Sequence, residues 1–344
     1  MPSPFPKETI HHIPYFRIQE YNGGQQNAEL TERRVGMERE KKLGILVGAG
    51  SYFIWGILPM YWKLAGEIDA IEILAHRMMW SFVFMVILIG IFGKRNSVMA
   101  ELRQICRQPK TLLAITAATM LISANWFLFI FSVNGNHILS ASLGYYINPL
   151  VNVVFAMLLL KERLRMGETI AVLIAAIGVI LLSISQGAIP WTAISLAITF
   201  SLYGLIKKMV KVNTWTGLTV ETMLVTPFAL LYLLFFADHA FMGYGASLNA
   251  VAIGGGLVTV VPLLLFASAA KQISYIMLGF LQYLAPTLML IVAVFVYGET
   301  LSAFEWISFL SIWIALIIYT TSNIVFAKRQ KRIAQYKMNA NHSV

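Results

Sequence analysis

Ten long apolar segments constrain the fold of this chain more than any other feature of its sequence. Each holds about 20 predominantly apolar residues, the helix length that crosses the roughly 30 Å hydrocarbon core of a bilayer. Backbone polar groups find no water at that depth, so the segments are expected to be helical. Their short connections predict a single bundle. The segments lie at residues 43–65, 71–92, 111–133, 138–160, 168–186, 189–206, 216–236, 250–270, 275–297 and 302–326.

Composition excludes an ordinary soluble domain. Hydrophobic residues make up 58% of the chain and charged residues only 12%, about half the charged fraction of typical soluble proteins. The net charge of +10 does not indicate a nucleic-acid partner, because the basic residues cluster between apolar segments instead of forming one patch. The predicted partner is the lipid bilayer. Cys106 is the only cysteine, so no disulfide framework or Cys-based metal site is expected, and no cofactor is predicted.

The distribution of lysine and arginine predicts the orientation in the membrane. Of the 26 basic residues, 24 lie before the first segment or in the connections after the second, fourth, sixth, eighth and tenth. Cytoplasmic loops are enriched in Lys and Arg. Both termini are therefore expected in the cytoplasm, which an even number of spans requires.

The sequence around Pro149 returns once, 137 residues later. Tyr146 then falls on Tyr283 and Pro149 on Pro286, without a gap. Two copies of five helices each must enter the membrane with opposite orientation, as in the inverted repeats of secondary transporters. Proline removes one helical hydrogen bond, so Pro149 and Pro286 predict two symmetry-related kinks near the bilayer midplane. Kinks that only pack against other helices are the alternative to a substrate cavity.

These observations predict an all-α membrane protein with ten transmembrane helices in a 5+5 inverted repeat. Residues 1–36 are polar and without period, which predicts a disordered extension, and Met37 is the expected initiator. Residues 37–186 form the first predicted repeat and residues 187–326 the second. Residues 327–344 form a basic cytoplasmic tail.

Ionisable residues inside membrane segments are costly and therefore candidates for function. Glu72, His76 and Trp80 share one face of the second segment, and Arg77 lies beside them. We expect His76 and Arg77 to offer positive charge or donors to a polar substrate, unless Arg77 simply extends toward the surface. Glu221 is the counterpart of Glu72 in the second copy. The two carboxylates are predicted gating groups at opposite mouths, with a helix-end role near the positive dipole as the alternative.

Polar and aromatic residues near the two prolines form a predicted amphipathic substrate pocket. Any one of them alone is more typical of helix packing, so the hypothesis depends on their convergence. The candidates are Asn125, Trp126, Tyr145, Asn148, Gln282 and Tyr283, joined by Trp80. Glu162, Glu299 and Glu305 lie at segment ends and are predicted to be structural, with Ser302 and Glu305 forming a capping box.

Several short motifs, taken together and in order, resemble the RarD family, EamA-type members of the drug/metabolite transporter superfamily. The resemblance covers roughly residues 40–325 and implies a ten-helix permease of the bacterial inner membrane. The motifs are Tyr52 to Lys63, Glu72 to Arg77, Asn125-Trp126, Ser142 to Leu150, Pro190-Trp191, Tyr203 to Lys208, Glu221-Thr222, Thr259 to Leu263 and Leu278 to Tyr283.

The sequence as a whole predicts a secondary transporter that moves a small organic metabolite or drug-like solute by alternating access. The absence of a Walker A loop disfavours an ATP-driven pump, and no hydrolase or protease motif indicates an enzyme. The alternative is a membrane sensor or scaffold whose loop 93–110 binds a partner. Homodimerisation and the identity of the solute stay open.

Overall fold

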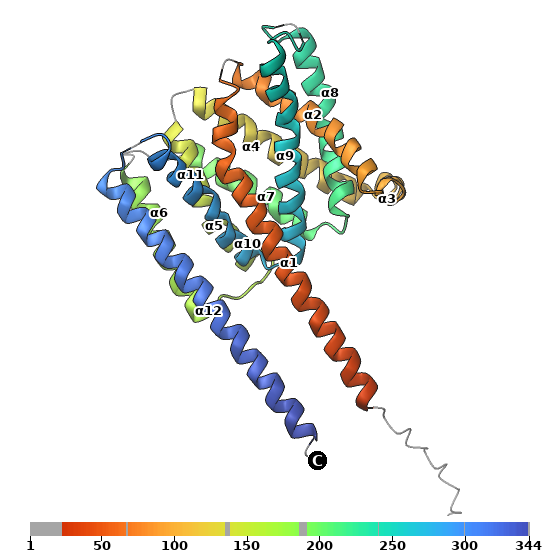
Figure 1. Ribbon diagram of the computed structural model, residues 1–344, viewed down its shortest axis with the longest axis vertical. Helices are drawn as coiled ribbons and strands as arrows, with labels where there is room; N and C mark the ends of the chain where they lie inside the picture. Colours follow the sequence, from red (N-terminus) through yellow and green to blue (C-terminus); the bar gives the residue numbers. More distant parts are fainter. Residues whose placement is uncertain are drawn as a thin grey trace, which may run out of the picture. The chain divides into compact units, whose positions relative to one another are not determined.

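A computed structural model describes residues 23–66, 68–134, 138–185, 191–239, 241–298 and 300–342. These residues form α-helices and no strands, so the all-α prediction is confirmed (Figure 1). The chain divides into two units, residues 1–40 and residues 41–344. The helices are α1 (Gly23–Lys63), α2 (Ala70–Ile91), α3 (Arg95–Cys106), α4 (Pro109–Asn134), α5 (Ile138–Leu158), α6 (Met166–Ser185), α7 (Trp191–Met209), α8 (Thr214–Phe235), α9 (Ala246–Gln272), α10 (Tyr275–Gln282), α11 (Leu284–Phe295) and α12 (Ala303–His342).

Each of the ten predicted segments coincides with a helix or, for 275–297, with the consecutive pair α10 and α11. Within the described ranges, eight helices or helix pairs are long and apolar enough to cross a membrane. The part of α5 at Leu143–Leu158 is a shorter apolar helix, and α7 ends in Lys207 and Lys208. The chain is therefore a multi-pass membrane protein. Residues 1–22 of the predicted extension lie outside the described residues, and α1 begins at Gly23, in the extension's last part.

Helix α3 occupies the predicted loop 93–110. Its Val98 and Ile105 are buried, while most of its polar residues are exposed, as expected of an amphipathic helix. It packs against α4 and α8. Glu101 of α3 accepts hydrogen bonds from the backbone N–H of Asn213 at 2.7 Å and from the hydroxyl of Thr216. The connection between α7 and α8 is thus held by a carboxylate from α3.

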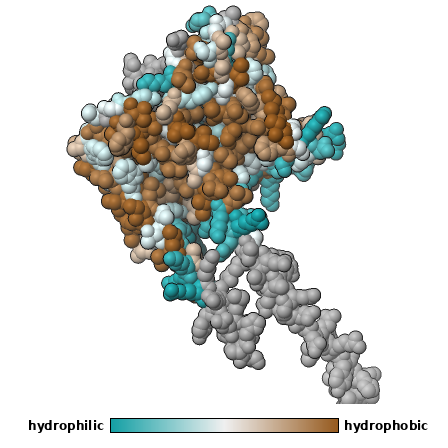
Figure 2. Space-filling model, viewed as in Figure 1, coloured by the Kyte–Doolittle hydropathy of each residue, from teal (hydrophilic) through white to brown (hydrophobic). Residues whose placement is uncertain are grey.

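Large apolar side chains cover much of the surface of the second unit. The face in Figure 2 is dominated by hydrophobic residues, and hydrophilic ones gather at its edges. Small residues such as Ala171, Ala175 and Ala197 are fully buried in the helix contacts. This distribution is the one expected in a bilayer, where small residues let helices approach closely and lipid tails solvate the large ones.

Three consecutive glycines in α9 lie where α1 and α2 pack against this helix. A Cβ on Gly255 would lie 3.4 Å from Cγ of Arg77, and a Cβ on Gly256 would lie 2.7 Å from the backbone nitrogen of Ser81. Tyr61 packs against Gly254, the first of the three glycines, and donates its hydroxyl to the carbonyl of Val251 at 2.6 Å. The glycines therefore bring α1, α2 and α9 together around Arg77.

Helices from the first half of the chain pack on helices from the second half. Helix α4 packs on α7 and α8. Helix α9 packs on α1, through Ser51 and Tyr61, and on α2. Helix α5 packs on α7, and α1 packs on α10 and α11 through Gly48 and Gly56. The contacts α2–α8, α5–α10 and α6–α12 also join the first half of the chain to the second.

The two prolines act differently on their helices. Pro286 lies in the first turn of α11, and the helix divides at Gln282 and Tyr283. Because proline has no backbone N–H, Pro286 cannot donate a hydrogen bond to the carbonyl of Gln282. Pro149 lies inside α5, which continues through it. The sequence predicted kinks at both, and the interruption between helices occurs at Pro286.

Candidate functional site

Arg77 lies between aromatic rings contributed by two other helices. Its Cζ is 4.7 Å from the ring centroid of Trp62 in α1 and 5.0 Å from that of Trp126 in α4, within the range of cation–π attraction. Its Nε donates to Oγ1 of Thr259 in α9 at 3.1 Å. Four helices therefore meet at one guanidinium. Two predicted site residues, Arg77 and Trp126, are in contact here.

Glu72 and His76 precede Arg77 in α2 by five residues and by one residue, and both lie against the segment that follows α8. Glu72 is fully buried and accepts the backbone N–H of Asp238 at 2.6 Å, and Nδ1 of His239 lies 3.8 Å from its other oxygen. The ring of His76 packs against Phe241 and Tyr244. Neither ring nitrogen of His76 has a hydrogen-bond partner among the residues that the structure describes. Both side chains thus contact the segment that connects α8 to α9.

Several other predicted site residues lie at helix contacts. Asn125 donates Nδ2 to the carbonyl of Leu196 at 2.8 Å and to Oγ1 of Thr199 at 2.9 Å, which joins α4 to α7. The backbone of Trp80 lies against Gly256 of α9, and its Nε1 is buried without a partner in the described part of the chain. Tyr145 is partly exposed, and the centroid of its ring lies 6.2 Å from that of Phe129.

The repeated tyrosines and prolines form a reciprocal contact between α5 and the α10–α11 pair. Tyr146 donates its hydroxyl to the carbonyl of Pro286 at 3.3 Å, and Tyr283 donates to the carbonyl of Tyr146 at 3.4 Å. Gly279 permits the crossing, because a Cβ there would lie 3.0 Å from the carbonyl oxygen of Pro149. The two copies of the repeated motif therefore contact each other.

The amides near this crossing bond to one another or to neighbouring helices. Asn152 of α5 donates to Oε1 of Gln282 at 2.9 Å, and Ser201 of α7 donates to Oδ1 of Asn148 at 3.3 Å. All four side chains are buried. Asn148 and Gln282 thus take part in polar contacts that join α5 to α7 and α10.

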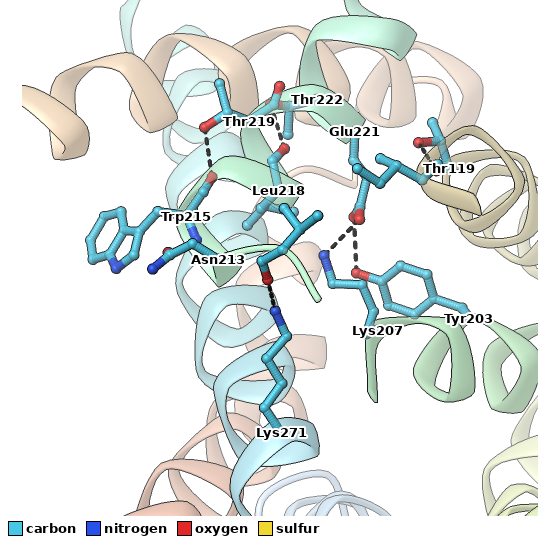
Figure 3. Close-up of polar contacts among 12 residues, drawn as sticks. Thr119, Tyr203, Lys207, Asn213, Trp215, Leu218, Thr219, Glu221, Thr222 and Lys271 are labelled. Carbon is cyan, nitrogen blue, oxygen red and sulfur yellow. Dashed lines mark hydrogen bonds and ion pairs between the residues drawn. The ribbon is translucent and has the colours of Figure 1, made fainter. Parts of the chain in front are cut away.

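Glu221 forms a buried ion pair with Lys207. Figure 3 shows the ammonium of Lys207 and the hydroxyl of Tyr203, both from α7, directed at the Glu221 carboxylate in α8. The distances are 2.6 Å from Nζ to Oε1 and 3.1 Å from the phenol oxygen to Oε2. The Lys207 and Glu221 side chains are only 6% and 5% exposed. A carboxylate so far from water needs such partners, because an unpaired buried charge is strongly destabilising.

Two small cavities share Glu221 as part of their walls. The first, of about 20 Å³, extends from Glu221 and Thr222 to Trp126. The second, of about 10 Å³, lies between Glu221, Lys207 and Lys271. Each has room for about one water molecule. Lys271 donates to the backbone carbonyl of Val212 in the turn between α7 and α8 (Figure 3).

Lys207, Tyr203, Trp62 and Thr259 were not predicted as site residues. The sequence places Lys207 in the basic connection after the sixth segment, because Lys208 and Lys211 follow it. Its spacing of four from Tyr203 places both on one face of α7 and was an available signal. Their common partner Glu221 lies on another helix, so only the tertiary structure identifies the pair.

The predicted structural roles of the segment-end carboxylates are confirmed where the structure describes them. Ser302 and Glu305 form the reciprocal hydrogen bonds of a capping box. Glu162 accepts the N–H groups of Tyr275 at 2.8 Å and Ile276 at 3.1 Å, and so caps α10. Glu299 lies outside the described residues.

Replacing Glu162 with alanine should destabilise the protein by about 1–2 kcal/mol, because two N–H groups at the start of α10 lose a charged acceptor. Thermal unfolding of the purified protein in detergent measures the loss. The exposed Glu40 offers a control, and Glu40→Ala should leave the unfolding temperature unchanged. Equal unfolding temperatures for the two variants would contradict a capping role for Glu162.

Comparison with known proteins identifies a family and several relatives that this chain resembles. Residues 42–184 match the EamA-like transporter family. The protein RarD of Escherichia coli (strain K12) is 41% identical over 297 residues, covering 86% of this chain and 99% of its own. An uncharacterized transporter of Pseudomonas aeruginosa is 45% identical over 282 residues, covering 80% and 93%, respectively. A solved crystal structure with 20% identity has a TM-score of 0.64 and covers 81% of this chain and 97% of its own, a likeness of fold.

The helical membrane fold and these relatives define the class as a multi-pass transporter of the drug/metabolite type. The chain belongs to the RarD family of EamA-like transporters.

Proposed function

We propose that this protein is a secondary transporter of the bacterial inner membrane that moves a small organic metabolite or drug-like solute by alternating access. The reciprocal contact between the two copies of the Tyr–Pro motif is the observation that carries the proposal. Tyr146 and Tyr283 each donate across the crossing of α5 with α10–α11. An interface between equivalent parts of two repeats can exchange roles when the repeats move against each other, which is the basis of alternating access.

The paired helix contacts support a 5+5 inverted repeat. Helices α1, α2, α4, α5 and α6 then correspond to α7, α8, α9, α10–α11 and α12. Under this correspondence, several contacts between helices of different position have a mate: α4 with α7 matches α9 with α1, and α4 with α8 matches α9 with α2. Ten spans would place both termini on the same side, and the lysine and arginine distribution favours the cytoplasm.

In this arrangement the beginning of α2 faces the outside and the beginning of α8 faces the cytoplasm. Glu72 ties α2 to the connection after α8, and Glu221 ties α8 to α7. Both carboxylates are buried in closed contacts. We assign them as gating residues: Glu72 holds the external connection over the bundle, and the Glu221–Lys207 pair closes the cytoplasmic side. The solute site lies between them, at Arg77, Trp126, Tyr145 and the polar residues of the proline crossing.

Flux measurements separate this proposal from a sensor or scaffold. The full chain, reconstituted in liposomes, is tested with labelled amino acids, nucleosides, organic acids and chloramphenicol-like amphiphiles. At least one class should enter protein-containing liposomes and not empty ones. A protein that binds members of the panel but transports none of them is a sensor, and the proposal fails.

For the transported solute, Arg77→Gln should lower the initial rate by roughly ten- to a hundredfold, because one charged hydrogen-bonding group contributes about 1.5–3 kcal/mol. Arg107→Gln is the matched control, since Arg107 is exposed at the end of α3. Its rate should equal that of the unchanged protein. An Arg77→Gln protein with full flux would remove Arg77 from the solute site.

A further inference from the structure

The guanidinium of Arg77 has no anionic partner of its own within the described part of the chain. Its Nε donates a hydrogen bond to Thr259. Neither Nη group donates a hydrogen bond to any residue that the structure describes, and no carboxylate among those residues lies within ion-pair distance of the guanidinium. Arginine stays protonated in proteins. An unpaired cation inside a membrane protein is costly, which makes it a candidate for binding a charged partner from outside the chain.

The position of Arg77 favours a solute over a lipid headgroup as that partner. Arg77 is the eighth residue of α2, so it lies about 10 Å along the helix from its start. Trp62, Trp126 and Thr259 come from three further helices and enclose the guanidinium within the bundle. The two Nη groups offer the planar pair of donors that matches a carboxylate or a phosphate.

Shared residues link this site to the two cavities and to a second set of cations. Trp126, which packs on Arg77, also lines the first cavity, and Glu221 lines the first cavity and the second. The second cavity is bordered by two lysines, Lys207 and Lys271, and by one carboxylate, Glu221. With all three ionised, its charged groups carry an excess of one positive charge. These shared residues define a candidate route from Arg77 to Lys207 and Lys271, and each cavity along it has room for about one water molecule in this conformation.

We infer that the solute is a small organic anion that binds first to Arg77 and then to Lys207, where it displaces the carboxylate of Glu221. This inference rests on the proposed transport function and adds the charge of the solute to it. Glu221 acts as an internal substitute for the solute: while it holds Lys207, α7 and α8 stay joined and the route is closed. An arriving carboxylate or phosphate takes over the ammonium, and the freed Glu221 no longer joins the two helices. No covalent step is involved.

The test measures binding of matched pairs of compounds to the purified full chain, by thermal stabilisation and by tryptophan fluorescence. Each carboxylate (phenylacetate, indole-3-acetate, 2-oxo acids) is paired with its neutral amide, and each phosphate ester with its alcohol. Binding to the folded state raises the unfolding temperature. We expect anions to bind and their neutral partners not to, and the active anion class tells carboxylate from phosphate recognition.

Three variants test the roles of the residues. Arg77→Gln should weaken binding of the active anion at least tenfold. Glu221→Gln should tighten it by about tenfold, because the internal competitor for Lys207 has lost its charge. Glu168→Gln is the matched control, since Glu168 is buried to a similar extent but pairs with Arg165, away from the route. It should leave the affinity unchanged.

Binding of neutral compounds as tight as their anionic partners would overturn the inference, as would binding confined to cations. A panel without any anion that binds would also overturn it, and so would weaker anion binding by Glu221→Gln. Stabilisation by anionic phospholipid alone, lost in Arg77→Gln, would assign Arg77 to a lipid headgroup. If liposomes take up a neutral solute and no anion, the transport function stands and the anion inference fails. Should Glu221→Gln not fold, the matched pairs and Arg77→Gln still decide.

Discussion

Gly256→Ala is expected to destabilise the protein by about 3 kcal/mol and to abolish transport, because the added methyl group meets the backbone of α2. A Cβ at this position would lie 2.6 Å from Cβ of Trp80 and 2.7 Å from the backbone nitrogen of Ser81. Backbone atoms cannot rotate away as a side chain can, so the whole helix must shift. That shift would move Arg77, which lies on the same helix and contacts the adjacent Gly255. Thermal unfolding in detergent and flux into liposomes measure the two effects.

Gly90→Ala is the control for this prediction. Gly90 is also a helical glycine, in α2, but no atom outside its own helix surroundings lies within 4 Å of a Cβ built there. Alanine has the higher helix propensity, so this variant should be as stable as the original or more stable by up to about 1 kcal/mol. Equal unfolding temperatures for the Gly256 and Gly90 variants would show that α2 and α9 tolerate separation.

Much of the fold follows from the sequence because the bilayer restricts the alternatives. Apolar segments of sufficient length must be helical there, and all ten predicted segments coincide with helices or a consecutive helix pair. Helix α3 was not predicted, because it is short and polar and its two buried residues, Val98 and Ile105, give a weak pattern. The different outcomes at Pro149 and Pro286 depend on neighbouring helices, which no local pattern describes.

The candidate site was predictable one helix at a time. Intramembrane charge identified Arg77, Glu72 and Glu221, because such groups are rare in apolar segments. The sequence could not tell that Glu72 and Glu221, although predicted to be counterparts, have different partners. Glu72 accepts a backbone N–H, whereas Glu221 binds the ammonium of Lys207. That difference depends on which residues the facing element supplies, and it becomes visible only when α7 and α8 are packed together.

Lys207→Met is expected to be the most destabilising of the single charge removals at this site, at about 3–5 kcal/mol, because it leaves the carboxylate of Glu221 buried without a cation. Tyr203 still donates to that carboxylate, but one neutral donor does not replace an ammonium. Removing both charges, in Lys207→Met/Glu221→Met, should recover most of the loss, since an apolar pair of similar volume is often as stable as a buried ion pair. Thermal unfolding of the single and double variants gives the coupling between the two residues as a double-mutant cycle.

Lys208 provides the matched control for this cycle. Its ammonium donates to the backbone carbonyls of Ala270 at 3.1 Å and Ile273 at 2.6 Å, and no carboxylate of the described residues is within ion-pair distance of it. Lys208→Met should therefore cost only about 1–2 kcal/mol, and Glu221→Met should not rescue it. If the two lysine variants were equally destabilised and Glu221→Met rescued neither, the Lys207–Glu221 pair would not hold α7 to α8. Recovered stability without recovered anion binding in the double variant would instead separate the structural role of the pair from its role in transport.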